Sequence, residues 1–188
     1  MSMVAAQPRF TPDDLLHLED EGQYELVGGR LVEKAMSSLS SRTAGIITIE
    51  IGIFLRQNPV GELYPEQSFQ CFPGNPDLIR RPDIAFISRD RAGGVAETDH
   101  VKISPDLAIE VVSPNDTIYD LDAKLADYRS AGVRLVWVVD PKWKTVRIHR
   151  ADRTVSELLA GDTLSGEQVL PGFSVIVENL IPKPPSTP

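Results

Sequence analysis

Two short, almost wholly apolar segments constrain the fold of this chain more than any other feature of its sequence. Residues 106–112 and 135–139 have the composition of β-strands that are buried on both faces. Between them a Ser-Pro-Asn-Asp turn breaks the chain, and a helix capped by Asp116 or Thr117 runs to about Ser130. The order of these elements predicts a mixed sheet with helices packed on it.

Several other segments have recognisable local patterns. A Thr-Pro-Asp-Asp sequence at 11–14 is typical of a helix start, and we expect this short helix to end at Gly22. Two adjacent glycines between β-patterned segments predict a tight hairpin over 24–33. The remaining strands are expected at 62–72, 82–88, 145–150, 154–159 and 173–177.

The segment 37–58 fits two patterns. Isoleucines at every second position over 47–53 are typical of a strand, whereas an apolar stripe over 46–54 fits a helix. The segment is long for one strand, and Ser40 or Ser41 could cap a helix. We therefore expect a helix, despite the low helix propensity of its β-branched residues.

The composition fits a soluble protein. Of the 188 residues, 41% are apolar and 24% charged, which excludes a disordered or collagenous chain. The net charge of −8 argues against a bulk electrostatic grip on nucleic acid and leaves only local basic patches for that purpose. Cys71 is the only cysteine, so neither an internal disulfide nor a cysteine metal cluster can form.

No repeat or linker divides the chain. We expect a single domain over 10–181, a flexible leader over 1–9 and a disordered, proline-rich tail over 182–188. Because we find neither a secretory signal nor about 18 consecutive apolar residues, we expect a cytoplasmic protein with no membrane partner.

Glu110 is the most informative single residue. A carboxylate within an apolar strand is costly unless it is paired, hydrogen-bonded or bound to metal, although a side chain near the strand end could reach solvent or an arginine. Asp83, on the preceding strand, is its natural partner, unless it only caps a turn after Pro82. Two acidic groups on neighbouring strands could hold one hard divalent cation.

Lys124 helps to decide between these interpretations. On the helix after Glu110, its spacing relative to Leu121, Leu125 and Tyr128 puts it on the apolar face that packs toward the sheet. The alternatives are a surface ion pair at i−4 or an ammonium that reaches past the core to solvent. A lysine that points at two carboxylates could position a water or stabilise charge on a phosphate.

Other charged residues give weaker signals. Glu25, in the first hairpin, fits an exposed strand residue as well as a functional one. Two basic sets could meet phosphates or form an ordinary solvated surface. These sets are Arg80, Arg81, Arg89 and Arg91, and Lys142, Lys144, Arg147 and Arg150 with Trp143 among them.

With these residues placed, the chain resembles the Uma2 family of restriction endonucleases, a branch of the PD-(D/E)XK nuclease superfamily, over about residues 10–180. The resemblance rests on the order and spacing of five segments. They are YELVGG at 24–29, RPDIAF at 81–86, PDLAIEVVSP at 105–114, DLDAKLADY at 120–128 and VWVVDP at 136–141. It implies an α/β (α+β) fold: a restriction-endonuclease-like mixed β-sheet core flanked by helices, with an extra N-terminal hairpin.

The resemblance also implies a function, a metal-dependent endonuclease that hydrolyses phosphodiester bonds in DNA. Asp83 and Glu110 would bind Mg²⁺ (or Mn²⁺), with the peptide carbonyl of Val111 as a third ligand. The superfamily lysine normally stands at the position of Val112, and here it matches the variant in which it has moved to the next helix as Lys124.

Further positions carry over from the same family. Glu25 matches an early glutamate that assists with the metal, and Asp120 and Tyr128 match helix positions that orient Lys124. A histidine often found at the start of the long helix is missing from residues 41–44. Cleavage of a duplex requires two cuts, so a homodimer is expected. The alternatives are a non-catalytic module for binding or assembly, and a hydrolase of RNA or another phosphodiester.

Overall fold

The computed structural model describes residues 9–19, 23–34 and 36–183. The expected end of the first helix at Gly22 is wrong, because that helix already ends at Leu16, with His17 as its C-cap. All but three residues of the expected leader and tail lie outside the described residues. The helices are α1 (Pro12–Leu16), α2 (Ser38–Gln57), α3 (Arg89–Ala92), α4 (Ile118–Ser130) and the 3₁₀ helix η1 (Val177–Leu180). The strands are β1 (Tyr24–Val27), β2 (Arg30–Glu33), β3 (Gly61–Pro65), β4 (Ile84–Ser88), β5 (Leu107–Val111), β6 (Leu135–Asp140), β7 (Thr145–Arg150), β8 (Val155–Leu158), β9 (Thr163–Ser165) and β10 (Ser174–Ile176).

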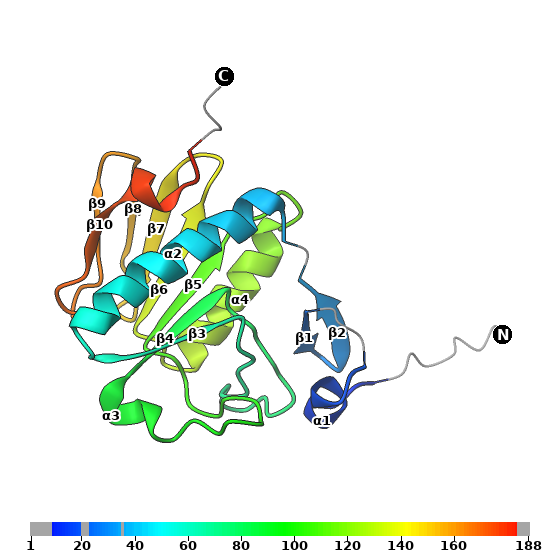
Figure 1. Ribbon diagram of the computed structural model, residues 1–188. Coiled ribbons are helices and arrows are strands. Elements are labelled where there is room, and N and C mark those ends of the chain that lie inside the picture. The colour runs from blue at the N-terminus through cyan, green and yellow to red at the C-terminus, as the bar shows by residue number, and fades with distance from the viewer. Residues whose placement is uncertain (1–8, 20–22, 35, 184–188) are drawn as a thin grey trace.

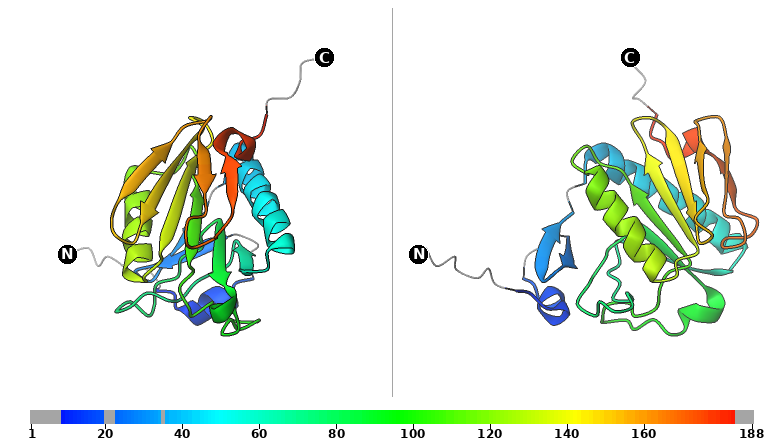
Figure 2. Two further views of the ribbon diagram at one scale, coloured as in Figure 1. Left: turned by 90° about the vertical axis from the view of Figure 1, so that its left-hand side faces the viewer. Right: turned by 180° about the vertical axis from the view of Figure 1, so that it is seen from behind.

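Six strands form one mixed sheet in the order β3-β4-β5-β6-β7-β8. Strands β5 and β6 are parallel and are joined by α4, while every other neighbouring pair in this sheet is antiparallel. Helices α2 and α4 cover opposite faces of the sheet, as Figures 1 and 2 show. The expected mixed sheet flanked by helices is therefore confirmed.

The alternation of side chains along the central strands builds one core on each face. Ile84, Phe86 and Ile109 belong to the core that packs under α2, whereas Ala85 and Ala108 belong to the core that packs under α4. The odd-numbered positions of β4 and the even-numbered positions of β5 thus share the α4 face. Asp83, two residues before Ala85, and Glu110, two residues after Ala108, are therefore directed to that same face.

Helix α2 confirms the helical interpretation of segment 37–58. Its buried side includes Ala44, Ile47 and Ile51, whereas Ile49 and Ile53 are exposed, so the alternating isoleucines divide between two sides of one helix. The prediction that Ser40 or Ser41 caps the helix is wrong. Ser37 is the N-cap, and Ser40 completes the capping box as its N3 residue.

Helix α2 contains no uninterrupted run of about 18 apolar residues, as expected, but it meets a broader criterion for a membrane-spanning helix. Its 20 residues are long and apolar enough to cross a bilayer by length and composition alone, with a mean hydropathy of 1.2 over the best window. On one side of α2, Ala44, Ile47 and Ile51 pack against the sheet. Serine, threonine and glycine residues interrupt the apolar residues of α2 along the sequence.

The strand predicted over 62–72 is too long. β3 ends at Pro65, which has no N–H group, and Glu66 follows with a φ of 51°, a left-handed conformation that ends the strand. Further along, Phe69 makes only isolated bridges, to Arg80 and to Val101. The short elements α3 and β9 were not predicted.

The β1–β2 hairpin lies beside the main sheet and contributes no strand to it (Figure 1). Its turn confirms the prediction, since Gly28 and Gly29 both have positive φ angles, of 61° and 78°. Leu26 ties the hairpin to the body through two backbone hydrogen bonds with Ile79, of 3.0 and 2.9 Å. This attachment turns one side of the hairpin toward the α4 face of the sheet.

Candidate functional site

Asp83 and Glu110 meet at one edge of the central sheet. Ile84 pairs with Ile109 across the antiparallel β4–β5 ladder, so one further step along the register sets Asp83 opposite Glu110. Both side chains are buried, with 4% and 5% of their surfaces exposed. The Oδ2 atom of Asp83 accepts a hydrogen bond of 2.6 Å from the backbone N–H of Val111.

Lys124 points into the same place from α4. Its ammonium lies 2.9 Å from Oε2 of Glu110 and 3.3 Å from Oε1 of Glu25. Tyr128, one turn later, donates its hydroxyl to Oε1 of Glu110. The predicted position of Lys124 on the face of α4 toward the sheet is therefore confirmed. The alternative of a surface ion pair between Lys124 and Asp120 is wrong, because the Asp120 carboxylate accepts from the hydroxyl of Thr117, the N-cap of the helix.

Glu25 is almost fully buried and is held by two neighbours besides Lys124. It accepts a hydrogen bond of 2.8 Å from the guanidinium of Arg80 and one of 2.9 Å from the backbone N–H of Arg81. Arg80 also pairs with Asp127 of α4, at 2.7 Å. The prediction that Arg80 meets phosphate or lies on a solvated rim is wrong, since only 5% of it is exposed.

A second lysine, which the sequence did not reveal, completes the site. Lys34 follows β2, and its ammonium lies 2.7 Å from Oδ1 of Asp83 and 3.2 Å from Oε2 of Glu66. Only 8% of its side chain is exposed. Lys34 ends the sequence RLVEK at 30–34, in which charged residues flank two apolar ones. This pattern does not distinguish Lys34 from an ordinary surface lysine.

Burial and charge shift the titration of these groups in opposing ways. Burial raises the pKa of Glu110, and the nearby ammonium of Lys124 only partly counters this effect. Burial also opposes the charged form of Lys124, but Glu110 and Glu25 together raise the pKa of its ammonium. The pKa of Glu25 is lowered because Lys124 and Arg80 outweigh the effect of its burial. The site therefore keeps a cationic lysine beside a carboxyl group that is costly to ionise.

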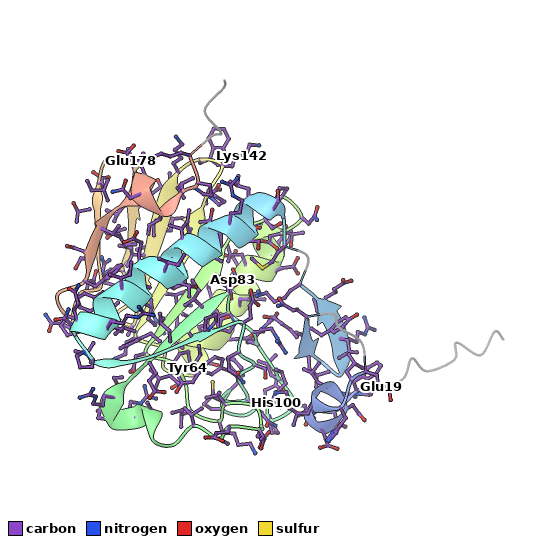
Figure 3. The ribbon with its side chains drawn as sticks, viewed as in Figure 1. Glu19, Tyr64, Asp83, His100, Lys142 and Glu178 are labelled. Carbon is purple, nitrogen blue, oxygen red and sulfur yellow. The ribbon has the colours of Figure 1, made fainter. Side chains whose placement is uncertain are left out.

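These groups line a pocket of about 310 Å³ between the sheet, α4 and the hairpin. Figure 3 labels Asp83, which lies at this junction. Ser113, just after β5, also lines the pocket, and its buried Oγ has no hydrogen-bond partner among the residues that the structure describes. The pocket thus contains both charged groups and an unsatisfied hydroxyl, which is typical of a site that takes a polar ligand.

The family to which the chain belongs follows from a comparison with family models. A model described as "Uma2: Putative restriction endonuclease" matches residues 12–178. The chain belongs to the Uma2 family.

A solved structure supports the fold assignment of this Uma2 chain. It is described as a "putative nuclease belonging to DUF820 from Anabaena variabilis ATCC 29413" and is similar with a TM-score of 0.76 at 20% sequence identity. The similarity covers 91% of this chain and 97% of that one. The expected restriction-endonuclease-like fold is thereby confirmed. A comparison with curated proteins found no match.

The oxygen donors in this Uma2 site fit a hard divalent cation. Mg²⁺ is usually bound by one or two protein carboxylates and keeps water or substrate phosphate as its other ligands. Asp83 and Glu110 supply two such carboxylates side by side, and the backbone of Val111 lies against Asp83. Within residues 9–19, 23–34 and 36–183, no three acidic, histidine or cysteine side chains cluster closely enough to hold a metal by themselves.

One of the predicted basic residues, Arg91, lies away from this pocket. Arg91 pairs with the buried Asp106 at 2.6 Å, at the opposite end of β5 from Glu110, and Arg134 joins the same carboxylate at 3.0 Å. These contacts neutralise a buried acid, so Arg91 is part of a structural ion-pair cluster.

The turn at 141–144, between β6 and β7, keeps an exposed basic and aromatic surface. Trp143 is 71% exposed, and the ammonium of Lys142 lies 5.5 Å from its ring. Because β5 and β6 are parallel, this turn lies at the same edge of the sheet as the carboxyl end of β5. Figure 3 shows Lys142 at this edge.

Proposed function

We propose that this protein is a metal-dependent endonuclease that hydrolyses phosphodiester bonds in DNA, with Mg²⁺ or Mn²⁺ as its cofactor. One observation carries the proposal: Asp83 just before β4, Glu110 in β5 and Lys124 in α4 converge in one pocket. Membership in a family described as restriction endonucleases supports the reaction class. Family and geometry thus favour the same chemistry.

Asp83 and Glu110, with the peptide carbonyl of Val111, would hold the cation. When bound, such a cation polarises a phosphoryl oxygen and lowers the pKa of a coordinated water. Because the two acids are buried, water screens their attraction for the cation only weakly.

Lys124 carries the positive charge that the chain itself contributes to the reaction. Its ammonium would orient the attacking water or stabilise the negative charge that develops on the phosphate. Glu25 acts as a positioning residue, because it is fixed by Arg80 and contacts Lys124. Tyr128 positions Glu110 in the same way.

DNA binding would rely on local surfaces, because the net charge of −8 opposes a bulk attraction. The exposed Trp143 and Lys142 lie at the edge of the sheet that also holds the pocket. Stacking on an aromatic ring beside an ammonium suits an unpaired or distorted base. A homodimer would supply the second site that cleavage of both strands requires.

The proposal is tested by plasmid nicking with purified protein and Mg²⁺ or Mn²⁺. We expect activity that EDTA abolishes, with at least a hundredfold loss in Asp83→Ala and in Lys124→Ala. Lys102→Ala, which removes only an exposed ion pair with Asp99, is the matched control and should keep full activity. Equal nicking by all four proteins would identify a contaminant and end the proposal.

A non-catalytic module is the second candidate, and one observation favours it. Asp83 is already paired with Lys34 and hydrogen-bonded to Val111, as in a purely structural ion-pair network. If the protein is such a module, Mn²⁺ should not shift its melting temperature. Mn²⁺ binding to the unmodified protein that is lost in Glu110→Gln would exclude the module. A panel of duplex DNA, single-stranded DNA and RNA separates the DNA enzyme from a hydrolase of RNA.

A further inference from the structure

We infer that the ammonium of Lys34 is a built-in placeholder for the metal, which neutralises Asp83 in the metal-free protein and must leave Asp83 when a divalent cation binds. The inference rests on the proposed metal site and adds a residue that controls its affinity. Lys34 comes from the hairpin, outside the sheet and helix that provide the proposed ligands.

The geometry sets Lys34 in direct competition with a cation. The ammonium nitrogen lies 2.7 Å from Oδ1 of Asp83, while Oδ2 accepts from the backbone N–H of Val111 at 2.6 Å. Both oxygens of this carboxylate therefore have a donor in the metal-free protein. A divalent cation held by Asp83 would need one of its oxygens at about 2.0–2.1 Å, and the ammonium of Lys34 already contacts one of the two. Two cations so close together in a buried pocket repel each other strongly.

A second carboxylate gives Lys34 a place to go. Glu66 accepts from the same ammonium at 3.2 Å and is partly exposed, with 25% of its side chain accessible. The backbone of Glu66 is fixed beside Asp83 by a hydrogen bond of 3.1 Å from its N–H to the Asp83 carbonyl, in a left-handed conformation with φ 51°. Lys34 can therefore release Asp83 and keep Glu66 as its counter-ion, without becoming an unpaired buried charge.

The charges around Lys34 explain why an ammonium sits there. Burial alone disfavours the charged form, but Asp83, Glu110 and Glu66 outweigh burial and raise the pKa of Lys34. Lys124 is the cation that opposes them. Without Lys34, two buried carboxylates would face each other at the β4–β5 edge with Lys124 as their remaining neutralising lysine.

A merely structural lysine and a placeholder predict opposite effects on metal affinity. If Lys34 only holds Asp83 in place, its removal should loosen the site and weaken metal binding. If Lys34 competes with the metal, its removal should destabilise the metal-free protein but tighten metal binding, because the pocket loses a repelling charge.

The test is calorimetric titration of the full chain with Mn²⁺, without nucleic acid. We expect Lys34→Met, which keeps the apolar stem and removes the charge, to bind Mn²⁺ at least tenfold more tightly than the unmodified protein. Lys34→Gln is measured beside it, so that poor folding of one variant does not remove the test. The control Lys102→Met, which removes an exposed ion pair, should change the affinity by less than twofold.

Unchanged or weaker Mn²⁺ binding in the folded Lys34 variants would overturn the inference. Asp83→Asn separates this failure from a failure of the proposed function. If Asp83→Asn abolishes binding while the Lys34 variants gain nothing, the metal site stands and only the placeholder role is wrong. If Asp83→Asn and the unmodified protein bind Mn²⁺ equally, the proposed metal site itself is wrong, and the inference falls with it.

Discussion

The hydroxyl of Tyr128 is one of two side-chain groups that hold Glu110, the other being the ammonium of Lys124, and the energy of the Tyr128 contact can be measured without any metal. Tyr128 is 1% exposed and Glu110 5% exposed, so neither partner can exchange this hydrogen bond for water. Burial and the neighbouring carboxylate raise the pKa of Tyr128, so the phenol keeps its proton and remains a donor. A hydrogen bond to a charged group contributes about 1.5–3 kcal/mol.

A double-mutant cycle isolates this contribution. Urea unfolding at pH 7 of Tyr128→Phe, Glu110→Ala and the double variant should give a coupling free energy of about 1.5–3 kcal/mol. A matched cycle on Tyr64 and Glu62, whose hydroxyl–carboxylate bond of 2.7 Å is exposed, should give about 0.5 kcal/mol or less. If the two cycles give the same coupling, Tyr128 does not hold Glu110 and the assigned positioning role is refuted. If the role is right, Tyr128→Phe should also weaken Mn²⁺ binding by about 10–100-fold.

Three further outcomes can be checked. Asp106→Asn should lower the free energy of unfolding by about 2 kcal/mol at pH 7, because it unpairs Arg91 and Arg134, both partly exposed. The pKa of Asp106 is lowered in the folded protein despite its burial, so this contribution is present above about pH 4 and fades as the pH falls further, which urea unfolding at several pH values would show or contradict. Burial raises the pKa of Cys71 to about 12, so alkylation at pH 8 should be far slower in the native than in the urea-unfolded protein, and equal rates would contradict this. DNA added without divalent metal should quench the fluorescence of the exposed Trp143, since the other tryptophan is buried. Quenching that persists in Trp143→Phe would exclude the turn at 141–144 as the DNA-binding surface.

The central part of the site could be predicted because short-range periodicity determines it. Strand alternation sets the face of Glu110, and the i, i+4 spacing from Lys124 to Tyr128 sets one face of α4. A carboxylate in an apolar strand then had to find a partner, and the structure supplies two, an ammonium and a hydroxyl. Each step uses only residues close in sequence.

Lys34, Glu66 and Arg80 could not be predicted, because tertiary contacts determine their environment. Lys34 reaches Asp83 only after the hairpin docks on Ile79, across 49 residues of sequence. Glu66 depends on a left-handed turn that ends β3 early. Arg80 has the sequence context of a surface residue and becomes buried only because two acids from distant elements neutralise it.

The β1–β2 hairpin and the residue after it bring three charged groups, Glu25, Glu33 and Lys34, to a pocket built on a sheet that the hairpin does not join. The two buried groups find opposite charges outside the hairpin, since Glu25 pairs with Arg80 and Lys124 and Lys34 pairs with Asp83. The docked hairpin therefore relies on counter-charges of the body of the protein. In return, Lys34 and Glu25 act together with Lys124 and Asp83 on the ionisation of Glu110.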